Sequence, residues 1–171
     1  KNNESIDQWG QFITTPFISD AVAKVNIKTK ASGENTRLVT TIFDAEGHKV
    51  SAEEASLRFG KEFDQNLKVE NPKLWSPETP YLYKAVAQLY VGNELKDEVA
   101  TRFGIREIKY EANKGFSLNG KVTKFKGVCL HHDLGPLGAA VNKAAVRRQL
   151  TILKDMGCNA ISHTKNKSRN S

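Results

Sequence analysis

The sequence predicts a mainly β protein, in which an immunoglobulin-like β-sandwich is followed by a short segment that mixes strands with a helix. Residues 1–108 contain seven short segments of strand-like composition, separated by turn signals, with no convincing helical pattern. After residue 108 the pattern changes to hairpin, strand, helix and strand. A length of 171 residues with 39% hydrophobic residues suits one domain or two small ones.

Seven strands are predicted in the first part of the chain. The clearest covers residues 23–30, where apolar and polar residues alternate as in a strand with one buried face. Gly92-Asn93 is a two-residue loop with glycine first, typical of a type II′ hairpin turn. The predicted strands are residues 11–18, 23–30, 37–44, 49–59, 63–69, 81–91 and 94–103. This part contains no cysteine, so the core must form without an inter-sheet disulfide.

The second part begins with a predicted hairpin around Asn119-Gly120, followed by a strand over residues 123–130. Asn142 is placed to cap a helix that ends at Gly157. Its apolar face is expected to hold Val146, Gln149, Leu150, Leu153 and Met156. A further strand begins at residue 158. Strand, helix and strand within about 40 residues predict a parallel βαβ unit.

The net charge also differs between the two parts of the chain, before and after residue 108. Residues 1–108 hold 14 Lys and Arg against 16 Asp and Glu, a net −2, whereas residues 109–171 hold 12 against 3, a net +9. These basic residues are scattered and have few aromatic neighbours, so we predict no nucleic-acid partner. No window approaches the roughly 18 apolar residues of a membrane-spanning helix, so we predict no membrane partner. Cys129 and Cys158 are predicted to be free, buried thiols.

Six segments carry recognisable motifs in a fixed order: residues 9–16, 71–83, 102–106, 116–121, 126–133 and 148–161. Together they resemble family 2 glycoside hydrolases of the β-galactosidase type. The resemblance implies that residues 1–108 are the immunoglobulin-like middle domain. It also implies that residues 109–171 are the N-terminal portion of a truncated TIM-barrel catalytic domain, a partial (β/α)8 barrel.

A complete (β/α)8 barrel needs about 250 residues, whereas only 63 follow residue 108, so the chain is interpreted as a fragment. Two strands and one helix of a barrel leave apolar surface exposed. We expect this surface to be covered by the sandwich or by a second copy in a homo-oligomer. After Ile161 the chain departs from the family pattern, because the Arg and Pro expected around His163 are absent.

Retaining glycosidases use two carboxyl groups about 5 to 5.5 Å apart. The barrel segment contains only Glu111, Asp133 and Asp155, and the resemblance places the catalytic glutamates on later strands. We therefore expect no catalytic residue in this chain and no activity from it alone. The resemblance implies that the whole protein cleaves terminal β-galactosides or related β-glycosides.

His131-His132-Asp133 follows the first barrel strand, at the end where (β/α)8 barrels build their active sites. The resemblance implies that His131 contacts the sugar, and that His163 is a second substrate-binding residue. One alternative is that the histidine is structural and forms hydrogen bonds within a loop. A weaker alternative is a metal site formed by His131-His132-Asp133, because adjacent side chains on a strand point in opposite directions. No cofactor is predicted for this chain. Metal use by the whole protein and its location, periplasmic or cytoplasmic, are left open.

Alternatives also exist for the roles of the two tryptophan residues and for the function of the whole chain. Trp75 could be a sugar platform, but the proline-rich stretch around it favours a rigid connection that packs Trp75 and Leu74 into the sandwich. Trp9 is interpreted as an anchor for a linker. The alternative function is a non-catalytic immunoglobulin-like module that binds carbohydrate or another protein.

Overall fold

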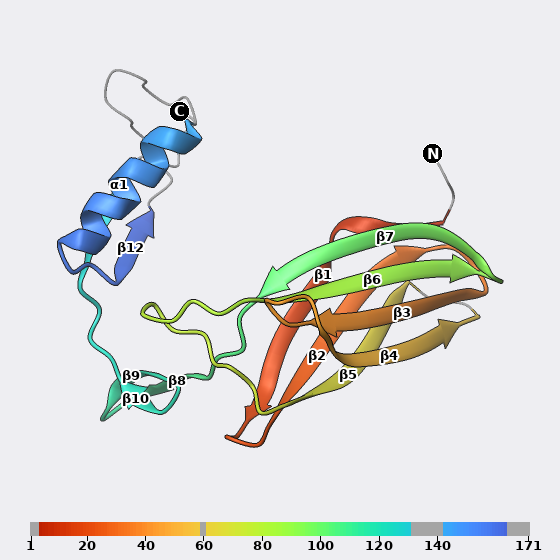
Figure 1. Ribbon diagram of the computed structural model, residues 1–171, viewed down its shortest axis with the longest axis horizontal. Coiled ribbons are helices and arrows are strands. Elements are labelled where there is room, and N and C mark those ends of the chain that lie inside the picture. The colour runs from red at the N-terminus through yellow and green to blue at the C-terminus, as the bar shows by residue number, and fades with distance from the viewer. Residues whose placement is uncertain (1–3, 59–60, 131–141, 164–171) are drawn as a thin grey trace, which may run out of the picture. The chain divides into compact units, whose positions relative to one another are not determined.

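The computed structural model describes residues 4–58, 61–130 and 142–163 (Figure 1). The chain divides into two compact units, Lys1–Val122 and Thr123–Ser171. We describe each unit by itself.

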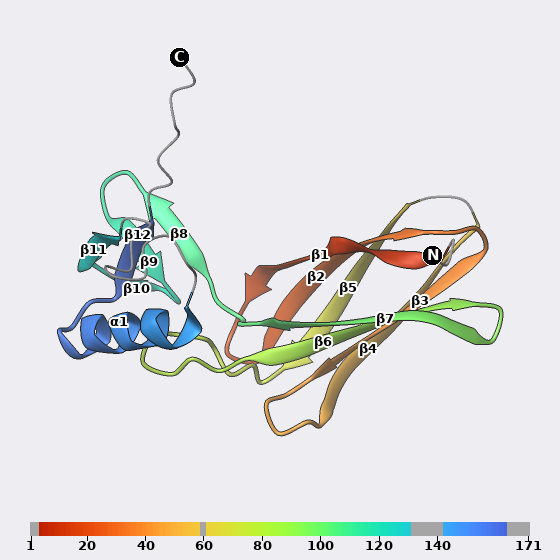
Figure 2. The same cartoon turned by 90° about the horizontal axis from the view of Figure 1, so that it is seen from above.

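The first unit contains a sandwich of two antiparallel sheets (Figure 2). Its strands are β1 (Ser5–Ile18), β2 (Val22–Ser32), β3 (Thr36–Phe43), β4 (Lys49–Leu57), β5 (Glu62–Glu70), β6 (Tyr83–Val91) and β7 (Glu94–Phe103). One sheet has the order β1-β2-β5 and the other β4-β3-β6-β7. The predicted immunoglobulin-like sandwich is confirmed, and each predicted strand matches an observed one.

Alternation along the strands builds the core between the sheets. In β5 every second residue is buried, namely Phe63, Gln65, Leu67 and Val69. β2, β3 and β6 follow the same pattern, and the core forms two clusters centred on Ile27 and Leu38. The sandwich therefore obtains its stability from apolar burial without a disulfide.

Two tight hairpin turns adopt the conformations that their residues favour. Gly92 has a φ of 60°, as the first central residue of a type II′ turn requires. Asn119 and Gly120 have φ of 50° and 76°, which is the pattern of a type I′ turn. Both turns match the right-handed twist of the strands that they join.

Asn119-Gly120 lies within a small sheet of three strands, β8 (Ile108–Glu111), β9 (Gly115–Leu118) and β10 (Lys121–Val122). By its contacts this hairpin belongs to the first compact unit. Compactness does not locate the border between family domains, so the border predicted after residue 108 stays a prediction.

The second unit contains β11 (Gly127–Leu130), α1 (Lys143–Asp155) and β12 (Ala160–His163). β11 and β12 pair in parallel, as predicted for a βαβ unit, and the described residues form no closed barrel. The Asn142 side chain accepts hydrogen bonds from the backbone N–H groups of Ala144 and Ala145, which confirms the predicted cap. α1 is too short and too polar to cross a bilayer.

The apolar face of α1 is only partly covered within the described residues. Val146, Gln149 and Leu153 are half-buried, whereas Leu150 and Met156 of the predicted face remain exposed, Met156 to 72%. The prediction of buried thiols is wrong for Cys129, which is exposed on β11, while Cys158 is half-buried and both are free. An incomplete α/β unit leaves apolar surface open because no neighbouring strands and helices cover it.

Candidate functional site

The carboxyl ends of β11 and β12 are the first candidate site, because (β/α)8 barrels build their active sites at this end of their strands. The register pairs Leu130 with His163 as the last residues of the two strands. The backbone of His163 thus lies beside the residue that immediately precedes His131. His131 itself, with His132 and Asp133, lies outside the described residues.

A glycine and an asparagine set this register. A Cβ on Gly127 would clash with the carbonyl oxygen of Ala160, so only glycine permits the close approach of the two strands. The Asn159 side chain donates to the carbonyl of Lys124 at 3.0 Å and accepts from the backbone N–H of Lys126 at 2.8 Å. These bonds hold the starts of both strands together and thereby align their carboxyl ends.

Glu111 and Asp155 are the carboxylates of the barrel segment that the structure describes. Glu111 ends β8 and pairs with Lys114 at 2.9 Å. Asp155 is the last residue of α1, on a different element. Among the residues that the structure describes, no three His, Cys, Asp or Glu side chains gather into a metal site.

Trp75 and Leu74 lie in the connection between β5 and β6, and the prediction that both pack into the sandwich core is confirmed for Leu74. Leu74 packs against the core of the sandwich, and Trp75 is half-buried. The indole contacts Gly104, where a Cβ would lie 2.7 Å from it, and the Arg106 guanidinium lies 5.2 Å from the ring centroid. Asn119 donates to the Trp75 carbonyl at 3.0 Å. The residues that contact the ring favour a structural role over a sugar platform.

Trp9 does not anchor a linker within the described part of the chain. Its side chain is 93% exposed, and its φ of 61° is unusual for a bulky residue. It lies in a β-bulge of β1 where the pairing with β2 shifts, next to Gly10, whose Cβ would lie 2.6 Å from a backbone oxygen. The adjacent glycine is the sequence signal that could have predicted the bulge.

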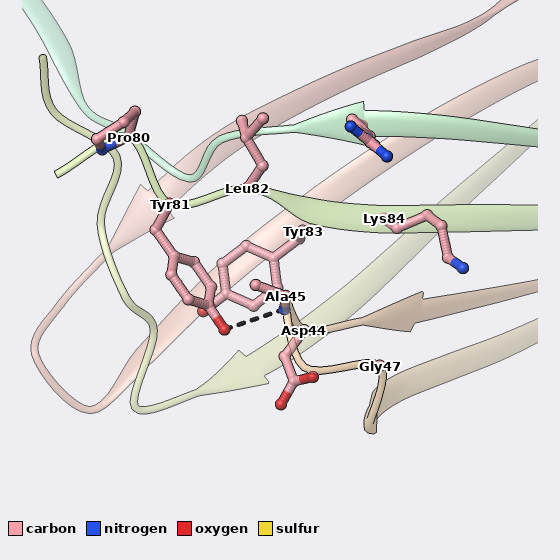
Figure 3. Close-up of a pocket in the computed structure, with 9 residues that line it drawn as sticks. Asp44, Ala45, Gly47, Pro80, Tyr81, Leu82, Tyr83 and Lys84 are labelled. Atoms are coloured by element: carbon pink, nitrogen blue, oxygen red, sulfur yellow. Dashed lines mark hydrogen bonds between the residues drawn. The ribbon is translucent and has the colours of Figure 1, made fainter.

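A hollow of about 450 Å3 opens beside the turn between β3 and β4 (Figure 3). Tyr81 points towards this turn. The Tyr81 hydroxyl donates to Glu46 Oε2 at 2.7 Å and accepts from the backbone N–H of Ala45 at 3.1 Å. The Tyr83 hydroxyl accepts from the backbone N–H of Lys73 at 2.9 Å. The sequence analysis did not identify this hollow, although the Tyr81-Leu82-Tyr83 motif lies in it.

The ionisable groups at this turn interact with one another through hydrogen bonds and an ion pair. The Tyr81 hydroxyl holds the pKa of Glu46 below its usual value, and Lys73 at 3.7 Å adds to the effect. Desolvation acts to raise the pKa of Asp44, but hydrogen bonds from the backbone and ring of His48 outweigh it, and the net shift is downward. Burial raises the pKa of Tyr83. These contacts stiffen the turn and leave no acid–base pair poised for chemistry.

Comparison with known proteins then decides the family. Residues 6–106 match the family model described as glycosyl hydrolases family 2. The chain belongs to this family.

The family 2 relatives include enzymes named for two sugars. The chain is 44% identical over 162 residues to the β-galactosidase BoGH2A of Bacteroides ovatus, covering 90% of this chain and 19% of the relative. It is 30% identical to a β-glucuronidase of Bacteroides fragilis, covering 88% of this chain and 22% of the relative. The chain thus spans about a fifth of the length of these relatives.

A solved structure of a family 2 member from Bacteroides cellulosilyticus superposes with a TM-score of 0.91 at 35% identity. The match covers 96% of this chain and 22% of that one. It therefore includes both the sandwich and the strand–helix–strand segment. The predicted relationship to family 2 is confirmed, and so is the predicted fold class.

Proposed function

We propose that this chain is part of a retaining glycoside hydrolase that cleaves terminal β-galactosides or related β-glycosides. The observation that carries the proposal is the parallel pair of β11 and β12, which places His163 at the carboxyl end of its strand in a family 2 chain. The relatives named β-galactosidase and β-glucuronidase support a β-glycoside as the substrate.

The proposal assigns binding, and no catalysis, to residues of this chain. His131 and His163 contact the sugar through ring nitrogens that can donate or accept hydrogen bonds. The acid/base and the nucleophile are proposed to be glutamates outside this chain, because the resemblance to family 2 places them on later barrel strands. No residue of the chain is proposed to hold a metal or another cofactor. Carbohydrate is the proposed partner, and nucleic acid and membrane are not.

The test compares hydrolysis of chromogenic β-galactoside, β-glucuronide and β-mannoside by two polypeptides. One is the 171-residue chain, and the other is the product of the complete reading frame. We expect turnover only by the longer polypeptide, with retention of the anomeric configuration. His163→Ala in the longer polypeptide is expected to lower kcat/KM at least about tenfold, since a lost hydrogen bond to a sugar hydroxyl costs about 1.4 kcal/mol or more.

His48→Ala is the matched control, because His48 lies exposed on the turn between β3 and β4. It is expected to leave kcat/KM unchanged. Turnover by the 171-residue chain alone would contradict the assignment of the catalytic glutamates to another part of the protein. Equal activity of the two histidine variants would contradict the role of His163.

A non-catalytic binding module is the second candidate. It is favoured by the exposure of Trp9 and Phe12, at 93% and 65%, on the edge strand β1. Exposed aromatic rings are a common feature of binding surfaces. A reading frame that ends without two further catalytic glutamates, together with no turnover by either polypeptide, would favour this candidate.

A further inference from the structure

The outer face of the four-stranded sheet carries three basic residues in one row across the strands, with Phe43 between two of them. The register places Lys49 opposite Phe43, Phe43 opposite Lys84, and Lys84 opposite Arg102. Neighbouring strands lie about 4.8 Å apart, so this cation row of Lys49, Phe43, Lys84 and Arg102 runs about 14 Å across the sheet. Like charges directly opposite each other destabilise a sheet. An anion bound between Lys84 and Arg102 would relieve this repulsion.

Within the described residues no carboxylate forms an ion pair with Lys49, Lys84 or Arg102. Lys84 lies over the ring of Phe43, 5.3 Å from its centroid. Asp44 follows Phe43 in the chain, but its carboxylate is engaged by His48 at 3.1 Å. The positive charge of the row is therefore not neutralised within the sandwich.

The other carboxylates of this face are distant and already engaged. Glu98 precedes Arg102 by four residues on β7, a separation of about 13 Å along the strand, beyond the Debye length of about 8 Å in physiological salt. Glu98 accepts a hydrogen bond from Gln88 at 2.7 Å, and Glu54 pairs with Arg37 at 3.1 Å.

Two hollows meet at Arg102. The first is the hollow of about 450 Å3 beside the β3–β4 turn, which Lys84 also lines (Figure 3). The second has a volume of about 560 Å3, and the residues that line it include Arg102, Arg106, Thr14 and Thr15. The residues that line the second hollow include no Asp or Glu. A guanidinium group binds a carboxylate through two parallel hydrogen bonds, so this hollow favours an anion.

A flat row of small residues borders the cation row. The register aligns Ala52, Thr41, Val86 and Ala100 across the four strands. None of these side chains rises far above the sheet. A ligand with one flat, weakly polar face can therefore lie across the strands while its charged groups reach the cation row.

We propose that this face binds an acidic glycan, in which the carboxylate of a uronic-acid-type sugar is held by Arg102 with Lys84 or Arg106. The choice of carbohydrate as the carrier of the charge rests on the proposed function. A polynucleotide is disfavoured because Phe43, the aromatic residue of the row, is half-buried beneath Lys84 and cannot stack a base.

Addition of an acidic peptide as an extra strand is disfavoured by the contacts of β7. Its edge is tied to β1, because Thr101 donates to the Gln11 side chain and Asp97 accepts from the backbone N–H of Ile6 at 2.8 Å. An extended peptide therefore finds the backbone of this edge obstructed.

The test titrates the isotope-labelled 171-residue chain with an oligogalacturonate at low salt and follows the backbone amides of β6 and β7. We expect saturable shifts around Lys84 and Arg102, and at least tenfold weaker binding by Arg102→Gln and by Lys84→Gln. A neutral β-galacto-oligosaccharide is expected not to bind. Arg37→Gln is the matched control, since Arg37 lies on the same face and is already paired with Glu54.

Unchanged affinity in both Arg102→Gln and Lys84→Gln, or the absence of saturable binding, would overturn the proposal. Equal shifts with inorganic sulfate, a polynucleotide or an acidic peptide would overturn its specificity for an acidic glycan. The outcome is separable from the proposed function. Binding without hydrolysis by the complete polypeptide would leave only this proposal standing, and hydrolysis without binding would leave only the proposed enzyme.

Discussion

Gln65 shows how a single polar residue can tie two sheets together inside an apolar core. Its side chain is fully buried on β5, accepts a hydrogen bond from the Thr40 hydroxyl at 2.6 Å and donates to the Glu53 carbonyl at 3.0 Å. Thr40 and Glu53 belong to the opposite sheet. A buried amide in one sheet whose partners lie in the other sheet fixes the position of the two sheets relative to one another, which apolar contacts alone specify weakly.

Gln65→Leu is expected to lower the free energy of unfolding by about 1 to 3 kcal/mol, because the Thr40 hydroxyl loses its partner. Thr40→Val in the same chain is expected to recover part of this loss, since both ends of that hydrogen bond are then apolar. Urea unfolding followed by tryptophan fluorescence measures both values. Gln8→Leu on the exposed part of β1 is the control, and a loss of similar size there would contradict the role of the Gln65 network.

Glu46 provides a pH-dependent contribution at the β3–β4 turn. Its pKa is lowered from 4.5 in the folded chain, chiefly by the Tyr81 hydroxyl. Its contribution to stability is therefore complete above a pH of about 4.5 and is lost as the pH falls through the folded pKa. Glu46→Gln is expected to flatten the fall in the urea midpoint between about pH 5 and about pH 3.

The matched control for this pH experiment is Glu34→Gln, which changes an exposed turn and leaves the Tyr81 contact in place. It is expected to keep the pH dependence of the unmodified chain. Identical slopes for all three proteins would show that the Tyr81–Glu46 hydrogen bond does not contribute.

At the scale of elements, close backbone approaches decide which strands can pair. Gly127 allows the backbone of Ala160 to come close at the start of the β11–β12 pair, and Gly10 allows the chain to form the bulge of β1. Each is a position where a Cβ would meet a backbone oxygen at less than 3 Å. The pairing of β11 with β12 brings the backbone of His163, a residue proposed to bind the sugar, level with Leu130.

Asn159→Ala is expected to loosen β12 by removing the side-chain bonds to Lys124 and Lys126. The amide protection of residues 160–163 against hydrogen exchange should fall at least about tenfold, which corresponds to about 1.4 kcal/mol. Asn113→Ala, in the exposed turn between β8 and β9, is the control. Unchanged protection in Asn159→Ala would mean that backbone pairing alone holds the strands.

For the whole molecule, the distribution of buried residues separates a self-sufficient part from a dependent one. Every residue of the two core clusters lies within residues 1–122, whereas α1 contains no buried residue. A unit whose described residues include no buried apolar side chain gains little from folding by itself. The sandwich should therefore carry the stability of this chain.

A chain shortened to residues 1–122 is expected to unfold cooperatively, with a free energy of unfolding within about 0.5 kcal/mol of that of the full chain. Trp9 and Trp75 both lie in this part, so tryptophan fluorescence reports on the sandwich in both proteins. Loss of the cooperative transition on shortening would show that residues 123–171 are needed for the sandwich to fold.

The full chain is expected to self-associate through the exposed apolar side chains of its second unit. Ile152 is 42% exposed and Met156 72% exposed. Exchange of both for Lys should reduce association in sedimentation velocity at about 100 μM. Leu95→Lys, at an exposed site on β7, is the control. A monomeric full chain at that concentration would contradict a second copy as the cover for α1.

The local elements of this protein could be predicted from its amino-acid sequence. Alternation predicted the seven strands, Gly92-Asn93 and Asn119-Gly120 predicted tight turns, and Asn142 predicted the start of α1. These features depend on residues that are near one another in the chain, so their physical causes can be seen without the fold. The ordered motifs also identified the family, which the comparisons confirmed.

Which residues from distant parts of the chain meet depends on the pairing of the strands in three dimensions. The cation row needs the register of four strands, and the placement of His163 beside Leu130 needs the parallel pairing of β11 with β12. Gln65 looked like one more position in an alternating strand until the opposite sheet supplied its partners. Strand register depends on contacts between segments far apart in sequence, and a shift of one residue would turn each side chain to the other face.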